Sequence, residues 1–181
     1  KIKFLANHYY LPVALAESEK VDFIQHIIKH KSEVDFIKEL EKHLQKEDNF
    51  FKQFDWWYFS KIDETLDEIY IPYYQAKTNR IEKFKPDYIF WLKKENDYTI
   101  LFVDPKGTEH TDGYRKIDGY SNIFEIKEQQ KRKEPKHIQY DKCNIKIKLL
   151  LKTNDIAKVL KNYEYYWFNE FSDLIEKLDK F

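Results

Sequence analysis

The 181-residue chain is long enough for one domain with a sizeable core, and its 32 basic and 32 acidic residues give a net charge of zero. Charged residues make up 35% and aromatic residues 18% of the chain, so tyrosine, phenylalanine and tryptophan must supply much of that core. No stretch approaches the ~20 apolar residues of a membrane span, and the single cysteine, Cys143, excludes an internal disulfide and favours a reducing cytoplasm.

The first 45 residues are predicted to form strands followed by a helix. Residues 3–15 read as a strand pair broken at Pro12, and residues 21–28 favour a strand although their apolar positions fit either period. A helix is predicted from Ser32, as its cap, to about Gln45. The apolar residues that recur there at helical spacing are Val34, Ile37, Leu40 and Leu44.

The middle of the chain is predicted to be rich in strands. Residues 50–59 form an aromatic cluster without a clear period, residues 68–75 read as a strand, and residues 77–83 as a polar link. Two apolar runs at 88–92 and 98–103 are separated by a short polar turn, which predicts a β-hairpin.

The C-terminal third is predicted to alternate helices and strands within a single domain, residues 1–181. The order βαβββαβ, with additions, predicts an α/β sandwich in which helices flank one mixed central sheet. The predicted elements are a loop at 108–113, a crossover helix at 114–130, a strand at 145–152, a short helix at 155–162 capped by Asp155, an aromatic strand at 163–168 and a last helix capped by Ser172.

The predicted hairpin brings together two carboxylates and one ammonium group. Asp104 and Lys106 are two residues apart at the end of the second strand and therefore share a face. Asp87 begins the neighbouring antiparallel strand at the same end of the hairpin. These are the groups that a metal-dependent phosphodiesterase needs, although the spacing alone also fits a solvated strand end with an ordinary proline turn.

The sequence around these residues resembles a known nuclease family. The segments Phe-Lys-Pro-Asp-Tyr-Ile-Phe-Trp-Leu at 84–92 and Phe-Val-Asp-Pro-Lys-Gly-Thr at 102–108 resemble the C-terminal nuclease domain of type III restriction enzyme Res subunits, within the PD-(D/E)xK superfamily. Residues 55–64 and 69–73 are similar to the same family. The helicase motifs of full Res subunits are absent, and there is no methionine, so we expect an excised domain or a stand-alone relative.

This resemblance implies a restriction-endonuclease-like fold and a Mg²⁺-dependent DNA endonuclease in which Mn²⁺ can substitute. Asp87 and Asp104 offer hard oxygen ligands, and the Pro105 carbonyl can add another. Lys106 would orient and polarise the attacking water. The first core helix of the superfamily often supplies a third acidic group, for which Glu41 is the expected candidate. Implied partners are double-stranded DNA, a modification (methyltransferase) subunit and a helicase motor in the parent protein, with no membrane.

A basic segment in the second half is the expected DNA-facing side. Residues 106–152 contain 12 Lys and Arg against 7 Asp and Glu, a local excess of five positive charges. The candidate phosphate contacts are Arg115 and Lys116, on the predicted crossover helix, and the run Lys131-Arg132-Lys133. A solvated helix face is the alternative interpretation of that run.

Two other functions remain open at this stage. The first is a catalytically inactive nuclease fold that binds DNA or a partner subunit, which metal-dependent cleavage would distinguish from the enzyme. The second is a different hydrolase built on His110 and Asp112, where His110 would act as the general base; only proximity in sequence supports it.

Overall fold

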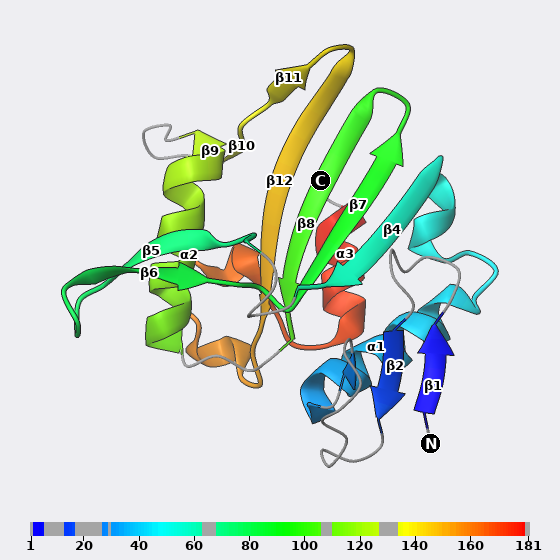
Figure 1. Cartoon of the computed structure of the whole chain (residues 1–181), viewed down its shortest axis with the longest axis horizontal. Coiled ribbons are helices and arrows are strands. Elements are labelled where there is room, and N and C mark those ends of the chain that lie inside the picture. Colours follow the sequence, from blue (N-terminus) through cyan, green and yellow to red (C-terminus); the bar gives the residue numbers. More distant parts are fainter. Residues whose placement is uncertain are drawn as a thin grey trace.

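A mixed six-stranded β-sheet organises the computed structural model, which describes residues 2–5, 13–16, 27–28, 30–62, 68–105, 110–126 and 134–179 (Figure 1). Its strands lie in the order β11-β12-β8-β7-β4, with β13 also paired to β12. Their bounds are β4 Trp56–Lys61, β7 Tyr88–Lys94, β8 Asp97–Asp104, β11 Ile138–Tyr140, β12 Cys143–Lys152 and β13 Trp167–Phe168.

The connections make this sheet mixed. Strands β4, β7 and β8 run antiparallel to one another, and the predicted hairpin is confirmed as β7–β8. Strand β12 runs parallel to β8 and is reached through the crossover helix α2, His110–Phe124. The predicted α/β sandwich with helices flanking a mixed sheet is therefore confirmed.

Alternation along the strands divides the core into two layers. Tyr88 and Phe90 point to the face covered by helix α1, Lys31–Leu44, helix α3, Phe171–Asp179, and the 3-10 turn η1, Phe50–Gln53. Ile89 and Phe102 point to the opposite face and pack with Ile117 of α2. We call these the α1 face and the α2 face.

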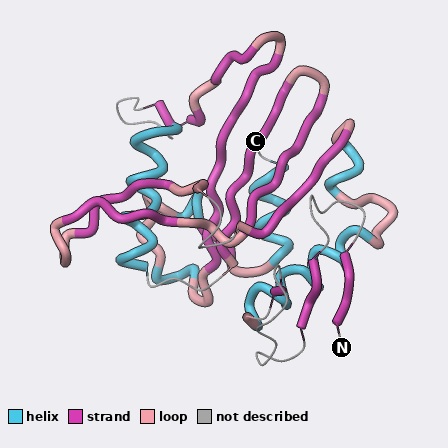
Figure 2. Tube along the Cα trace, in the orientation of Figure 1, coloured by secondary structure: helices cyan, strands magenta, loops and turns pink. Residues whose placement is uncertain are grey.

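Three smaller sheets surround the central one (Figure 2). Strands β1, Ile2–Leu5, and β2, Val13–Ala16, form the predicted antiparallel pair, and β3, Ile27–Ile28, lies parallel to β2. Strand β9, Glu125–Ile126, pairs with β10, Glu134–Pro135. Strands β5, Ile71–Gln75, and β6, Arg80–Phe84, form a separate hairpin. No helix among the described residues is long and apolar enough to cross a bilayer.

The hairpin β5–β6 corrects the prediction of a polar link at 77–83. Ile71 and Phe84 are buried, whereas Arg80 and Lys83 are exposed, so the sequence of β6 looks polar although it forms a strand. The hairpin packs on α2 and lies outside the central sheet.

Helix α2 begins earlier than the predicted 114–130 and ends at Phe124, so the predicted loop at 108–113 is wrong for residues 110–113. Both of its glycines are places of close approach. A Cβ on Gly119 would come within 3.0 Å of Pro72 O on β5, and one on Gly113 would meet the ring of Trp167. Glycine weakens a helix considered alone, but Gly119 permits the contact that holds β5 against α2.

Helix α1 confirms the prediction of a helix over about 32–45, but Ser32 does not cap it. The N-cap position is His30, without a side-chain cap hydrogen bond. Helix α3 starts at Phe171, and the Asp173 carboxylate, rather than Ser172, accepts hydrogen bonds from the backbone N–H groups of Asn169 and Glu170.

Two other C-terminal predictions gave a longer helix and a longer strand than the structure contains. The helix expected at 155–162 is the short 3-10 turn η2, Ile156–Lys158, and the Asp155 carboxylate forms an ion pair with Lys158 at 2.9 Å rather than capping it. The aromatic strand expected at 163–168 is the 3-10 turn η3, Glu164–Tyr166, followed by the two-residue β13.

Candidate functional site

Asp87 and Asp104 occupy facing positions at one end of the β7–β8 hairpin. The last pair in the register is Tyr88 with Val103, so one further step places Asp87 opposite Asp104. Each aspartate is only 5% exposed. Directly opposed Cβ atoms on antiparallel strands lie about 4.5–5.5 Å apart, which is close enough for two carboxylates to share one cation.

Neighbouring strands hold both aspartates in place. The Asp87 carbonyl accepts a hydrogen bond of 2.8 Å from the Ile62 N–H at the end of β4. Asp104 pairs with Leu151 of β12. Asp87 lies two residues before Ile89, and Asp104 lies two residues after Phe102. Because residues two apart on a strand share a face, both carboxylates point to the α2 face.

The two residues that follow Asp104, Pro105 and Lys106, are only partly described. Pro105 is buried directly after β8. Lys106 and the run Lys131-Arg132-Lys133 lie outside the described residues, so their roles remain predictions.

Glu33, which the sequence analysis did not select, is the helix α1 carboxylate beside this end of the sheet. It is 0% exposed and forms an ion pair with Lys61, the last residue of β4. The Tyr88 hydroxyl donates a hydrogen bond of 3.4 Å to the Glu33 backbone carbonyl. Glu41 is half-buried eight residues further along α1, about 12 Å away along the helix axis.

A signal for Glu33 was present in the sequence. It lies three and four residues before Phe36 and Ile37, which places it on the apolar stripe of the helix. The buried residues of α1 are Glu33 and three apolar residues of that stripe, Phe36, Ile37 and Leu40. A carboxylate at a stripe position near a helix N-terminus was a candidate for burial.

The two polar pairs approach the sheet end from different faces. Lys61 lies two residues after Phe59 on β4, so it points to the α1 face, where it meets Glu33. Asp87 and Asp104 point to the α2 face. Across the described residues, no group of three His, Cys, Asp or Glu side chains could hold a metal ion. The described part of the site therefore consists of two carboxylates.

Two facing carboxylates are chemically suitable ligands for a hard divalent cation. Carboxylate oxygens are the ligands that Mg²⁺ prefers, and Mg²⁺ is commonly bound by one or two carboxylates, with waters and substrate oxygens completing the shell. Asp87 and Asp104 would hold such an ion, and the Pro105 carbonyl is an available third oxygen.

The two predicted DNA contacts on α2 have partners within the protein. Arg115 donates a hydrogen bond from Nη1 to Gln75 Oε1 on β5 and lies 3.7 Å from the Asp112 carboxylate. Lys116 Nζ lies 4.3 Å from the centroid of the Phe84 ring. Both side chains help to attach the β5–β6 hairpin to α2, and their role as phosphate contacts remains a prediction.

The alternative hydrolase on His110 and Asp112 remains a prediction, because the His110 side chain lies outside the described part of the structure. His110 is the first residue of α2, and Asp112 lies beside Arg115. The ion pair with Arg115 gives Asp112 a structural role on the helix surface.

Residues 24–174 match the model of the YagJ family. No curated protein and no solved structure matches the chain. The matched range includes α1, the central strands and α2, and so it spans every residue of the candidate site.

Proposed function

The chain belongs to the YagJ family, and we propose that it is a divalent-metal-dependent DNA endonuclease domain, of the type III restriction enzyme kind, that hydrolyses phosphodiester bonds. The observation that carries this proposal is the facing pair of buried carboxylates, Asp87 and Asp104, at one end of the β7–β8 hairpin.

The order of elements supports the same proposal. Helix α1 is followed by the antiparallel strands β4, β7 and β8, then by the crossover helix α2 and the parallel strand β12. This is the αβββαβ part of the order βαβββαβ that the sequence predicts, and it is compatible with the restriction-endonuclease-like fold that the resemblance implies. It places Asp87 before the second of these strands and Asp104 at the end of the third.

Each residue of the site has a distinct task in the proposed reaction. The carboxylates of Asp87 and Asp104 bind Mg²⁺, or Mn²⁺ in its place. The bound ion supplies Lewis-acid stabilisation of negative charge on the phosphate. Lys106 orients the attacking water and offsets charge that develops at phosphorus. The ion pair of Glu33 with Lys61 fixes α1 against the strand end that carries Asp87.

The proposed substrate is double-stranded DNA, and sequence selection is assigned to other components. The net charge of zero leaves little general attraction for DNA, so the isolated domain is expected to bind weakly and with steep salt dependence. A modification subunit and a helicase motor in a parent protein would then select the site and deliver the domain to it.

Plasmid nicking tests the proposal. The purified protein should nick supercoiled DNA with Mg²⁺ or Mn²⁺ and not with EDTA, and Asp104→Ala should abolish the activity. Asp35→Ala is the matched control, because Asp35 forms only a surface ion pair with Lys38 on α1. Nicking by Asp104→Ala at the native rate would contradict the proposal.

A catalytically inactive nuclease fold is the second candidate. The position of Glu33 favours this function, because its carboxylate forms an ion pair with Lys61 on the α1 face. Among the described residues, the two aspartates therefore meet without a third acidic residue from α1. DNA binding without cleavage in any divalent metal would select this function.

A further inference from the structure

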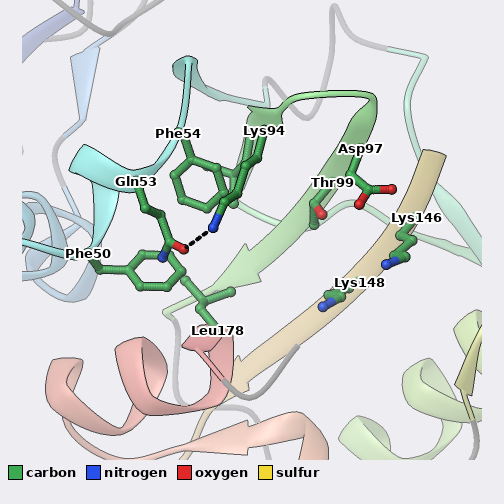
Figure 3. Close-up of a pocket in the computed structure, with 10 residues that line it drawn as sticks. Phe50, Gln53, Phe54, Lys94, Asp97, Thr99, Lys146, Lys148 and Leu178 are labelled. Carbon is green, nitrogen blue, oxygen red and sulfur yellow. Dashed lines mark hydrogen bonds between the residues drawn. The ribbon is translucent and has the colours of Figure 1, made fainter. Parts of the chain in front are cut away.

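A second polar site lies at the turn end of the β7–β8 hairpin, away from the aspartates. A cavity of about 260 Å³ opens there between η1, the strands β7, β8 and β12, and the C-terminal end of α3 (Figure 3). Phe50, Phe54 and Leu178 form its apolar wall, and Lys94, Lys146 and Lys148 line it with ammonium groups. Asp97, in the lining of this cavity, lies seven residue steps along β8 from Asp104, about 24 Å away.

The strand register explains why these side chains converge. Lys146 and Lys148 are two apart on β12 and share the α1 face with Leu150 of the core. Lys146 pairs with Thr99, and Lys94 pairs with Asp97 across the hairpin. In Figure 3, Lys146 and Lys148 project from β12 on one side of this space, and Lys94 extends toward Gln53 on the other side.

The cavity carries an excess of positive charge. Three lysines line it against one carboxylate, that of Asp97. Asp97 Oδ1 already accepts a hydrogen bond of 2.7 Å from Asn144 Nδ2, and Lys94 Nζ donates one of 3.2 Å to Gln53 Oε1. The lining therefore has a formal charge of plus two at neutral pH.

Of the three lysines that line the cavity, Lys148 is the buried one. It is 5% exposed and occupies a core-facing position beside Leu101, on the strand that continues into Leu150. Burying an ammonium group carries a desolvation cost that an apolar side chain of similar volume avoids. A lysine at this position is suited to binding an anion.

We propose that this cavity binds a nucleoside monophosphate, with the phosphate dianion among Lys94, Lys146 and Lys148 and the flat base against Phe50 and Phe54. The two excess positive charges match a phosphate monoester, whose second ionisation has a pKa of about 6. The volume lies below the roughly 300 Å³ at which ordinary ligand pockets begin, so the ligand is a single nucleotide rather than a dinucleotide. Either a free nucleotide or the 5′-phosphorylated end of a DNA strand can present this group. Nucleotide binding in this cavity is independent of the proposed endonuclease activity.

Calorimetric titration in EDTA tests the site separately from any metal-dependent reaction. The probes are AMP, thymidine 5′-monophosphate, the matching nucleosides, and a single-stranded oligonucleotide with and without a 5′-phosphate. We expect a monophosphate or the phosphorylated oligonucleotide to bind with a Kd below about 1 mM, and the unphosphorylated partner at least about tenfold more weakly. Which of the two binds more tightly identifies the source of the group.

The lysine variants assign the binding to this cavity. Lys148→Met keeps the length of the side chain and should weaken binding about tenfold or more. Lys94→Met, at the exposed rim, is the second variant and should weaken binding in a protein whose core is untouched. Lys142→Met, in the exposed β11–β12 turn, should bind as the native protein does. Equal binding of nucleoside and monophosphate, no binding at about 1 mM, or native affinity in both pocket variants would overturn the proposal.

Discussion

The carboxylate of Glu33 and the ammonium group of Lys61 form an ion pair that joins the first turn of α1 to the last residue of β4. Glu33 is completely buried, whereas the Lys61 side chain keeps 20% of its surface exposed. Because Lys61 pairs with Tyr88, which follows Asp87, this ion pair and the facing aspartates are features of the same end of the sheet.

Replacing Lys61 should lower the free energy of unfolding more than replacing Glu33. Lys61→Met leaves the Glu33 carboxylate in a buried position with its cation removed, and we expect a loss of about 3–5 kcal/mol in the free energy of unfolding. Glu33→Gln leaves only a partly exposed ammonium group and should cost less. Urea unfolding of both variants measures the difference. A cost below about 1 kcal/mol for Lys61→Met would contradict a stabilising role for the pair.

Gly119→Ala should destabilise the protein although alanine favours helices. Alanine gains about 1 kcal/mol of helix propensity over glycine, but its Cβ would collide with the backbone carbonyl of Pro72, and overpacking typically costs about 1–3 kcal/mol. Asn122→Ala, at an exposed position of the same helix, is the control and should be neutral or slightly stabilising, because alanine has the higher helix propensity. A melting temperature for Gly119→Ala at or above the native value would show that β5 yields at this contact.

The hairpin and its two aspartates could be predicted because their signals are local. Apolar runs separated by a polar turn define β7 and β8, and the first residue of a hairpin lies beside its last residue whatever surrounds them. The hairpin pattern alone therefore predicts that Asp87 lies beside Asp104.

The features that the sequence did not reveal depend on distant partners. The burial of Glu33 needs Lys61, 28 residues later, and the burial of Lys148 needs the cavity that η1 and α3 help to form. The need for glycine at position 119 likewise depends on a tertiary contact, the close approach of β5 to α2. The local pattern places Glu33 on the apolar stripe of α1, but it carries no information on the long-range contacts that decide whether a charged residue is buried.

His43 should make the protein less stable in mild acid. Its Nε2 accepts a hydrogen bond of 3.1 Å from the Phe50 N–H, and its ring packs against Phe51 and Phe171. Burial lowers the pKa of His43 below its usual range; nearby Lys46 lowers it further, and Asp48 partly opposes both effects.

Protonation of His43 favours the unfolded chain. The unfolded chain takes up a proton near pH 6.5, before the folded protein does, so the contribution of His43 is fully present above that pH and declines below it. Urea midpoints at about pH 7.5 and about pH 5.5 should differ less for His43→Gln than for the native protein. His137→Gln, at an exposed histidine, should keep the native difference, and an equally large difference in His43→Gln would exclude His43 as its source.

Asp104→Asn should separate metal binding from folding, because it removes one charge with little change of shape. Two facing carboxylates repel each other when no cation lies between them, so the variant should be slightly more stable than the native protein in EDTA. A ligand that binds only the folded state stabilises it by about 2.7 kcal/mol at a hundredfold excess over its Kd, which for a chain of this size raises the melting temperature by about 5–10 °C. The native protein should show this increase with Mn²⁺, Asp35→Asn should show it equally, and Asp104→Asn should show little of it. If Mn²⁺ raises the melting temperatures of the native protein and Asp104→Asn by the same amount, Asp104 does not bind the metal, and the proposed endonuclease site loses one of its two carboxylate ligands.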